Sequence, residues 1–190
     1  MMSDPVEVLD YWLGEVGPKG WYEQNDKVDA EIRDCFGDLW QSALDGGLEH
    51  WVDGASGTLA YLIVTDQFSR NMFRGDPRAF ATDPQARAAA RRALAANWDQ
   101  DVPAPERQFF YMPFEHSEDP EDQALAVSCF DTRIESPENA LHARAHQEII
   151  KRFGRFPFRN AALDRISSSE EEEFMQKGGY SAIVRALRQG

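Results

Sequence analysis

Apolar residues in this chain recur mainly at intervals of three and four, the spacing that gathers them on one side of an α-helix. Alternation with a period of two, which is typical of strands, is not convincing in any segment. The pattern therefore predicts an all-α fold. Helices are expected at roughly 5–15, 25–45, 57–73, 77–81, 84–97, 104–112, 120–132, 137–153, 169–177 and 179–188.

Proline follows directly after a capping residue at five places in the chain. A side-chain oxygen at the N-cap accepts hydrogen bonds from the first free amides, and proline at the next position has no amide to leave unpaired. Each pair therefore predicts the start of a helix. The pairs are Asp4-Pro5, Asp76-Pro77, Asp83-Pro84, Asp119-Pro120 and Ser136-Pro137.

The predicted helix 57–73 carries two charged residues on its apolar side, because a step of about 100° per residue aligns them with it. This apolar stripe consists of Leu59, Leu62, Ile63, Asp66, Arg70 and Phe73. An inward charge has to be paired, and aspartate four positions before arginine is the favourable order within a helix. We therefore expect an Asp66–Arg70 ion pair that fixes helix packing, with Gln67, Asn71 and Arg74 available for a binding site.

A short polar connection is expected between a helix that ends at Pro113 and the helix that begins after Asp119. It holds Glu115, His116, Ser117 and Glu118. Functional groups are often displayed on such connections. A histidine near two carboxylates can act as a general base, although a histidine that only ties the turn to a helix is the simpler interpretation of His116.

The predicted helix 137–153 places His142 and His146 in one narrow sector that faces the interior. Histidines four apart can share a zinc ion, but no third or fourth ligand is specified and the glutamate of the zinc-protease motif is missing. We therefore predict no metal site. Histidines hydrogen-bonded to Asp66 or Glu115 are the favoured interpretation.

The segment 142–165 gathers six basic residues against two acidic ones. Gly154 is expected to end the helix, and the following residues to form an extended or turning loop. Guanidinium groups gathered in this way form either an internal salt-bridge network or a site for a small anion. In the second case Arg155 and Arg159 would join Arg70 and Arg74 around the anion.

Composition limits the classes of partner. The chain has 190 residues, 42% of them hydrophobic, which suits a single domain over 1–190. The net charge of −13 and the isoelectric point near 4.7 argue against nonspecific binding to nucleic acid or to an anionic membrane. No apolar stretch is long enough to span a bilayer.

Cofactor motifs are also missing: the sequence has no Gly-rich phosphate loop, nucleophile elbow or dinucleotide-binding fingerprint, so no cofactor is predicted. Cys35 and Cys129 form no metal-type pair, and Cys35 is expected to be a buried, reduced thiol on the apolar face of its helix. The N-terminal residues do not have the pattern of a signal peptide. A cytoplasmic location is the expectation.

Four blocks of the sequence resemble the bacterial family catalogued as domain of unknown function 924. They are VLDYWLG, LAYLIVTDQFSRNMFRG with AFATD, RQFFYMPFEHSEDPEDQ, and HQEIIKRFGRFPFRNAALDR, and they extend over about residues 6 to 175. The resemblance implies an all-helical fold related to tetratricopeptide-like right-handed superhelices, although no internal repeat is detectable. It implies no established activity.

Within these blocks, the matching polar positions are Asp66, Gln67, Arg70, Asn71, Arg74, His116, Ser117, Glu118, His146, Arg155, Arg159, Asn160 and Arg165. The chain departs from the family's pattern at Phe158, where the family typically has histidine, and at Asp164, where it typically has glycine. If the missing histidine were catalytic, this member would be impaired. If the cluster is structural or binds through arginine, phenylalanine can take its place.

The first hypothesis for function is a pocket that binds a small anionic metabolite, a phosphate or a carboxylate, with His116 and His146 as the candidates for acid–base chemistry. Its expected ligand-binding residues are Asp66, Gln67, Arg70, Asn71, Arg74, His116, Glu118, His146, Arg155, Arg159 and Asn160. The alternative is a tetratricopeptide-like module that binds a protein or peptide, in which the polar cluster is structural. Exposed apolar area near Trp12, Trp40 or Trp98 would support a homodimer.

Overall fold

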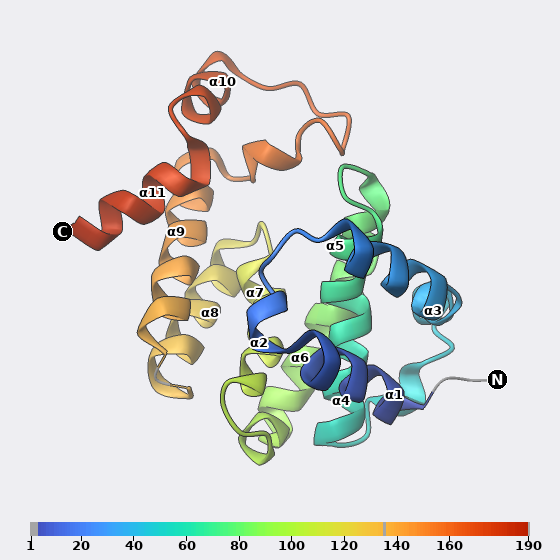
Figure 1. The fold of residues 1–190 in the computed structure, drawn as a ribbon. Coiled ribbons are helices and arrows are strands. Elements are labelled where there is room, and N and C mark those ends of the chain that lie inside the picture. Colours follow the sequence, from blue (N-terminus) through green and yellow to red (C-terminus); the bar gives the residue numbers. More distant parts are fainter. Residues whose placement is uncertain (1–3, 135, 190) are drawn as a thin grey trace. The chain divides into compact units, whose positions relative to one another are not determined.

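The computed structural model describes residues 4–134 and 136–189 (Figure 1). The chain divides into two compact units, unit 1 (Met1–Pro113) and unit 2 (Phe114–Gly190). All regular elements in the described residues are helical, and none is a strand. The predicted all-α class is therefore confirmed, while the right-handed superhelix and the single domain over 1–190 stay predictions.

Unit 1 begins with three consecutive helical segments and one long helix. They are α1 (Pro5–Leu9), the π-helical η1 (Asp10–Val16), α2 (Gly17–Gly20) and α3 (Asp26–Leu44). Its central segment is α4 (Ala55–Leu62), which continues through the π-helical η3 (Ile63–Phe68) into α5 (Ser69–Met72). The remaining helices are the 3-10 turns η2 (Glu49–Trp51), η4 (Pro77–Phe80), η5 (Trp98–Asp101) and η6 (Glu106–Phe110), and α6 (Asp83–Ala96). The short α7 (Met112–Glu115) joins the two units along the chain.

The central segment of unit 1 is buried from Thr58 to Ser69 without interruption. It packs against α1, α3 and α6, which cover different sides of it. Aromatic rings surround Phe68, with the ring centroids of Trp12 and Phe36 at 5.5 and 4.9 Å. Burial therefore extends well beyond the predicted stripe, because tertiary packing also covers the residues on the other sides of this segment.

Unit 2 contains α8 (Pro120–Thr132), α9 (Pro137–Phe153), the 3-10 turn η7 (Pro157–Arg159), α10 (Ser169–Gln176) and α11 (Gly179–Gln189). Within this unit α9 packs against both α8 and α11 (Figure 1). A core of Ile149, Ile150, Phe156 and Phe174 lies where α9, η7 and α10 meet. Gly154 ends α9 in a left-handed conformation, with φ of 67°, as predicted.

Three of the five predicted caps form as expected: the side chains of Asp4, Asp76 and Asp119 accept backbone N–H bonds at their helix starts. Ser136 occupies the N-cap of α9, but its hydroxyl contacts Asn139 Oδ1 instead, at 2.6 Å. The prediction for Asp83 is wrong, since it is the first residue of α6 and its carboxylate binds an arginine.

Two further predictions are corrected by the structure. Pro113 does not end a helix, because proline is tolerated in the first turn and here lies within α7. Cys35 is exposed, because it lies about 100° around α3 from its buried neighbour Phe36. None of the helices in the described ranges is long and apolar enough to cross a membrane.

Candidate functional site

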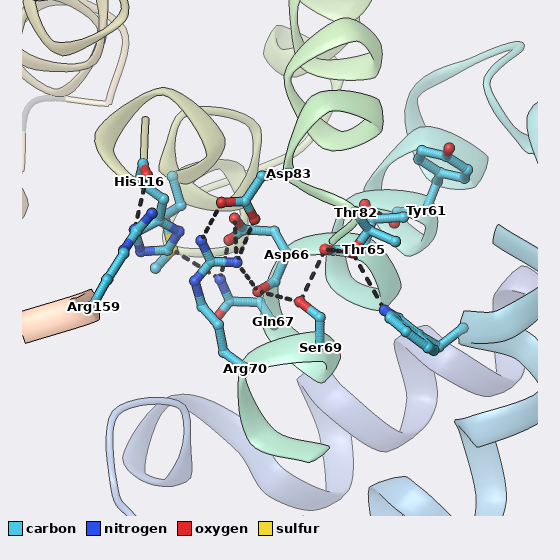
Figure 2. A network of polar contacts seen from close by, with 12 residues as sticks. Tyr61, Thr65, Asp66, Gln67, Ser69, Arg70, Thr82, Asp83, His116 and Arg159 are labelled. Atoms are coloured by element: carbon cyan, nitrogen blue, oxygen red, sulfur yellow. Dashed lines mark hydrogen bonds and ion pairs between the residues drawn. The ribbon is translucent and has the colours of Figure 1, made fainter. Parts of the chain in front are cut away.

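In unit 1, the predicted Asp66–Arg70 ion pair is present and belongs to a larger cluster (Figure 2). Arg70 Nη1 lies 3.2 Å from Asp66 Oδ1, and the guanidinium donates two hydrogen bonds to the Asp83 carboxylate, at 2.9 and 3.1 Å. Burial alone would lower the pKa of Arg70, but the two aspartates raise it above its usual value. Arg70 is therefore a fixed cation between two carboxylates.

Gln67, Asn71 and Arg74 also have partners inside unit 1. Gln67 Nε2 donates to Asp66 Oδ2 at 2.6 Å. Asn71 Nδ2 and the Arg74 guanidinium both donate to the buried Asp29 of α3, at distances from 2.5 to 3.0 Å. Asp29 was not among the predicted site residues, although its spacing to Ile32 and Phe36 places a carboxylate on the apolar face of its helix.

In unit 2, two guanidinium groups bind carboxylates through paired hydrogen bonds. Arg155 donates to Glu171 at 2.6 and 2.8 Å, and Arg165 donates to Glu118 at 2.8 and 3.0 Å. Hydrogen bonds from Arg155 and from the capping residue Ser168 lower the pKa of Glu171 from 4.5 to about 2. The predicted ligand residues Arg155 and Glu118 are therefore both engaged within the unit.

Arg159 and Asn160 hold the same region together from the end of η7. Arg159 Nη2 donates to the His116 carbonyl at 2.8 Å (Figure 2), and its guanidinium lies 4.6 Å from the Phe156 ring centroid. Asn160 Nδ2 donates to Ser167 Oγ at 3.0 Å and to Glu171 Oε2 at 3.3 Å. These contacts connect the turn after α7 to the loop between α9 and α10.

His146 forms an ion pair with Glu115, one of the two acceptors, Asp66 and Glu115, that the sequence suggested for the histidines. Its Nδ1 lies 2.8 Å from Glu115 Oε1 and 3.0 Å from the carbonyl of His142. A carbonyl only accepts hydrogen bonds, so Nδ1 carries the hydrogen. Burial alone would raise the pKa of Glu115, which is 6% exposed, but His146 beside it holds that pKa below its usual value. Glu115 is therefore ionised, and its carboxylate orients the imidazole of His146.

His146 lies in the wall of a pocket of about 520 Å³ within unit 2, which we call the His146 pocket. Its lining residues are His146, Phe158, Met175, Gly178, Gly179, Tyr180 and Ser181. The ring of Tyr180 lies 4.8 Å from that of His146. Because Nδ1 is engaged and no described residue forms a hydrogen bond with Nε2, Nε2 is the nitrogen left for the pocket.

The remaining wall of the His146 pocket was not foreseen from the sequence. Phe158 and Met175 are 40% and 43% exposed, large fractions for apolar side chains. Gly178 directly precedes α11, and Gly179, Tyr180 and Ser181 are the first residues of this helix, whose first turn contains no acidic residue. The one sequence signal is the Gly178-Gly179 pair directly before a helix, which allows a close approach to the backbone.

His142 differs from its predicted position. Its side chain is 36% exposed and faces α11, where Nδ1 contacts the Tyr180 hydroxyl, instead of lying in the interior. His116 and His146 are close, with ring centroids 6.2 Å apart. Among the described residues no group of three or more His, Cys, Asp and Glu side chains is arranged to hold a metal ion.

The geometry defines a class of small all-helical proteins in which several partly exposed arginines are paired with carboxylates and the second unit contains a histidine-walled pocket. The model of a family described as bacterial protein of unknown function, DUF924, matches residues 8–179, and the chain belongs to this family. The structure is similar to that of a protein of unknown function from Agrobacterium tumefaciens. That similarity has a TM-score of 0.87 and 36% identity, over 92% of this chain and 97% of the other. No curated protein matches the chain.

Proposed function

We propose that unit 2 binds a small molecule that carries an oxyanion, a carboxylate or a phosphate, on an apolar body, in the His146 pocket. One observation carries this proposal: His146 Nδ1 is held by Glu115 and by the His142 carbonyl, which leaves Nε2 to the pocket. A histidine oriented by a carboxylate in this way is typical of binding and catalytic sites. We assign binding, and no reaction, to the site.

Two donors in the pocket favour an oxyanion as the ligand's polar group. When His146 is protonated, Nε2–H donates into the pocket and the ionised Glu115 balances the ring's charge. The first amides of α11 have no acceptor within their own helix, and Gly179, Tyr180 and Ser181 line the pocket. Because no acidic side chain occupies that first turn, the positive end of the helix dipole is left for a ligand.

The rest of the ligand is expected to be apolar. Phe158, Met175 and Tyr180 form the other wall, and two of them are unusually exposed for their type. The volume of about 520 Å³ suits a small organic molecule, since such pockets usually measure about 300–1,000 Å³. An aromatic or aliphatic acid fits this combination.

The arginines do not line this site. Arg155 and Arg165 are each engaged by a carboxylate within unit 2, and Arg70 and Arg74 by carboxylates within unit 1. An anion would have to displace these internal partners to bind the guanidinium groups. Of the residues predicted from the sequence, His146 is therefore the one that we place against the ligand.

Thermal unfolding with benzoate and phenyl phosphate tests the proposal, with benzyl alcohol as the neutral analogue. A ligand that binds only the folded state at 100 times its Kd stabilises by about 2.7 kcal/mol. We expect a saturable rise in Tm with the acids and a smaller rise with the alcohol. In His146→Gln the acids should raise the Tm no more than the alcohol does. His50→Gln, which removes an exposed histidine of unit 1, should behave like the wild type.

The proposal is overturned if neither acid changes the Tm and neither shifts the nuclear magnetic resonance signals of His146. It is also overturned if His50→Gln loses the effect to the same degree as His146→Gln. Circular dichroism of each variant establishes that the fold is retained before binding is compared.

A further inference from the structure

Tyr180 connects the His146 pocket to a second histidine of α9. Its hydroxyl contacts His142 Nδ1, and the two rings stack with centroids 5.9 Å apart and planes inclined by 22°. The other nitrogen of His142, Nε2, lies 3.2 Å from Glu138 Oε1. His142 therefore lies between a carboxylate and a residue of the pocket wall.

These contacts determine how the hydrogen atoms are placed when His142 is neutral. The carboxylate of Glu138 only accepts hydrogen bonds, so Nε2 carries the hydrogen and Nδ1 has a lone pair. That lone pair accepts the O–H of Tyr180. The one hydrogen that the tyrosine can donate is thus committed to His142 and is not available to a ligand.

Protonation of His142 reverses the direction of this hydrogen bond. Both ring nitrogens then carry hydrogens, so Nδ1–H donates to the Tyr180 oxygen. The hydroxyl keeps its own hydrogen but no longer donates it to His142. We propose that Tyr180 is a second donor to the oxyanion bound in the His146 pocket and that protonation of His142 makes this donor available. This inference rests on the proposed function, and it adds a pH dependence to the same site.

Charged groups face His142 from its own helix and from the elements packed against it. On α9, Glu138 contacts His142 directly, and Arg188 of α11 binds the same carboxylate. Glu115 lies nearby through its pair with His146. On the α8 side, Asp131 and Arg144 pair with each other. Carboxylates and arginines keep their charge between about pH 5 and pH 8, the range in which histidines change theirs.

Binding of an oxyanion should therefore be linked to two protonation events. One places a hydrogen on His146 Nε2. The other places a hydrogen on His142 Nδ1, so that the Tyr180 hydroxyl no longer donates to His142. The affinity for benzoate should rise as the pH falls through this range. Removing the Tyr180 hydroxyl should abolish the part of the rise that depends on His142 and leave the part that depends on His146.

Benzoate affinity measured by titration calorimetry between about pH 8 and pH 5.5 tests this, a window that spans histidine titration. At the acidic end of the window, Tyr180→Phe should bind benzoate about three- to tenfold more weakly than the wild type, because it lacks one hydrogen bond. Tyr180→Phe keeps the ring, and Tyr22→Phe is the matched control, since it removes the hydroxyl that an exposed tyrosine of unit 1 donates to Gln108. Proton uptake on binding should fall in Tyr180→Phe alone.

A ligand-free measurement tests the same inference separately. Nitrogen-15 resonances of the imidazole rings report the tautomer, and neutral His142 should carry its hydrogen on Nε2. A neutral His142 with its hydrogen on Nδ1 overturns the inference. So does a gain in benzoate affinity that is the same in Tyr180→Phe and in the wild type, and in that case the pocket itself stands. If benzoate does not bind at any pH in the window, both the pocket and the role of Tyr180 are overturned.

Discussion

Glu118 and Arg165 are joined by two parallel hydrogen bonds, of 2.8 and 3.0 Å, although they lie 47 positions apart in the chain. Glu118 also accepts the backbone N–H of Phe156, at 2.8 Å. One carboxylate therefore satisfies three donors of the loop that follows α9. Burial alone would raise the pKa of Glu118, but Arg165 and the Phe156 amide hold it below its usual value.

We expect Glu118→Ala to destabilise unit 2 by about 1–3 kcal/mol, because the Phe156 amide and the Arg165 guanidinium lose their acceptor. Glu148→Ala is the control in the same unit. It removes an exposed pair with Lys151 and should cost less than about 1 kcal/mol. Urea unfolding measures both. Equal losses in the two variants would contradict the structural importance of Glu118.

Arg70→Ala should destabilise the protein by about 3–5 kcal/mol, because it removes the guanidinium from between two buried carboxylates. Arg70→Lys should recover part of this loss, since an ammonium keeps the charge but not the paired hydrogen bonds to Asp83. Arg78→Ala breaks an exposed pair with Asp76 and should change the midpoint of urea unfolding little. An Arg70→Ala protein as stable as Arg78→Ala would refute this account.

Stability should fall in acid through Glu171. Its folded-state pKa is lowered from 4.5 to about 2, so its contribution is complete above pH 4.5 and is lost as the pH falls toward about 2. Glu171→Gln should be less stable than the wild type at neutral pH and should show a smaller loss of Tm in this interval. Melting curves at stepped pH values measure the difference. If the Tm of the variant falls with pH as steeply as that of the wild type, Glu171 is not a source of the loss of stability in acid.

Asp164 adopts a left-handed backbone conformation, with φ of 50°, a region that favours glycine. We expect Asp164→Gly to stay within about 1 kcal/mol of the wild type, because glycine adopts this conformation without a steric cost. Asp164→Val should lose about 1–3 kcal/mol, since a β-branched residue is strained there. Thermal unfolding of the two variants provides the comparison, and a valine variant as stable as the glycine variant would contradict it.

Phe158→His places a second imidazole in the wall of the His146 pocket. The side chain is 40% exposed and stacks on Phe156 at 5.1 Å, so the fold should tolerate the change. If the pocket binds oxyanions, a second imidazole should raise the affinity for benzoate at acidic pH by about tenfold, the effect of one charged hydrogen bond. Titration calorimetry at acidic and neutral pH tests this, and an affinity unchanged at both would argue against an anion in the pocket.

The positions of the helices follow from local features of the sequence. Capping aspartates before proline and the glycine at 154 act within a few residues of where they occur, so their effect is visible without a partner from elsewhere. The Asp66–Arg70 pair is equally local, four positions along one helix. A histidine on an apolar face needs an acceptor, so a partner for His146 was expected, but the sequence left Asp66 and Glu115 as alternatives and the structure has Glu115.

The partners of the arginines were decided only by the tertiary structure. Arg74 reaches Asp29 over 45 positions and Arg155 reaches Glu171 over 16, and nothing in either local sequence specifies the other. The same holds for the pocket, in which the start of α11 meets a histidine of α9. The sequence by itself determined which segments are helical and which polar groups had to be paired, because periodicity and capping are short-range. Which carboxylate each guanidinium binds, and which nitrogen of His146 is left for a ligand, depends on how the helices pack, because these contacts join residues that only the fold brings together.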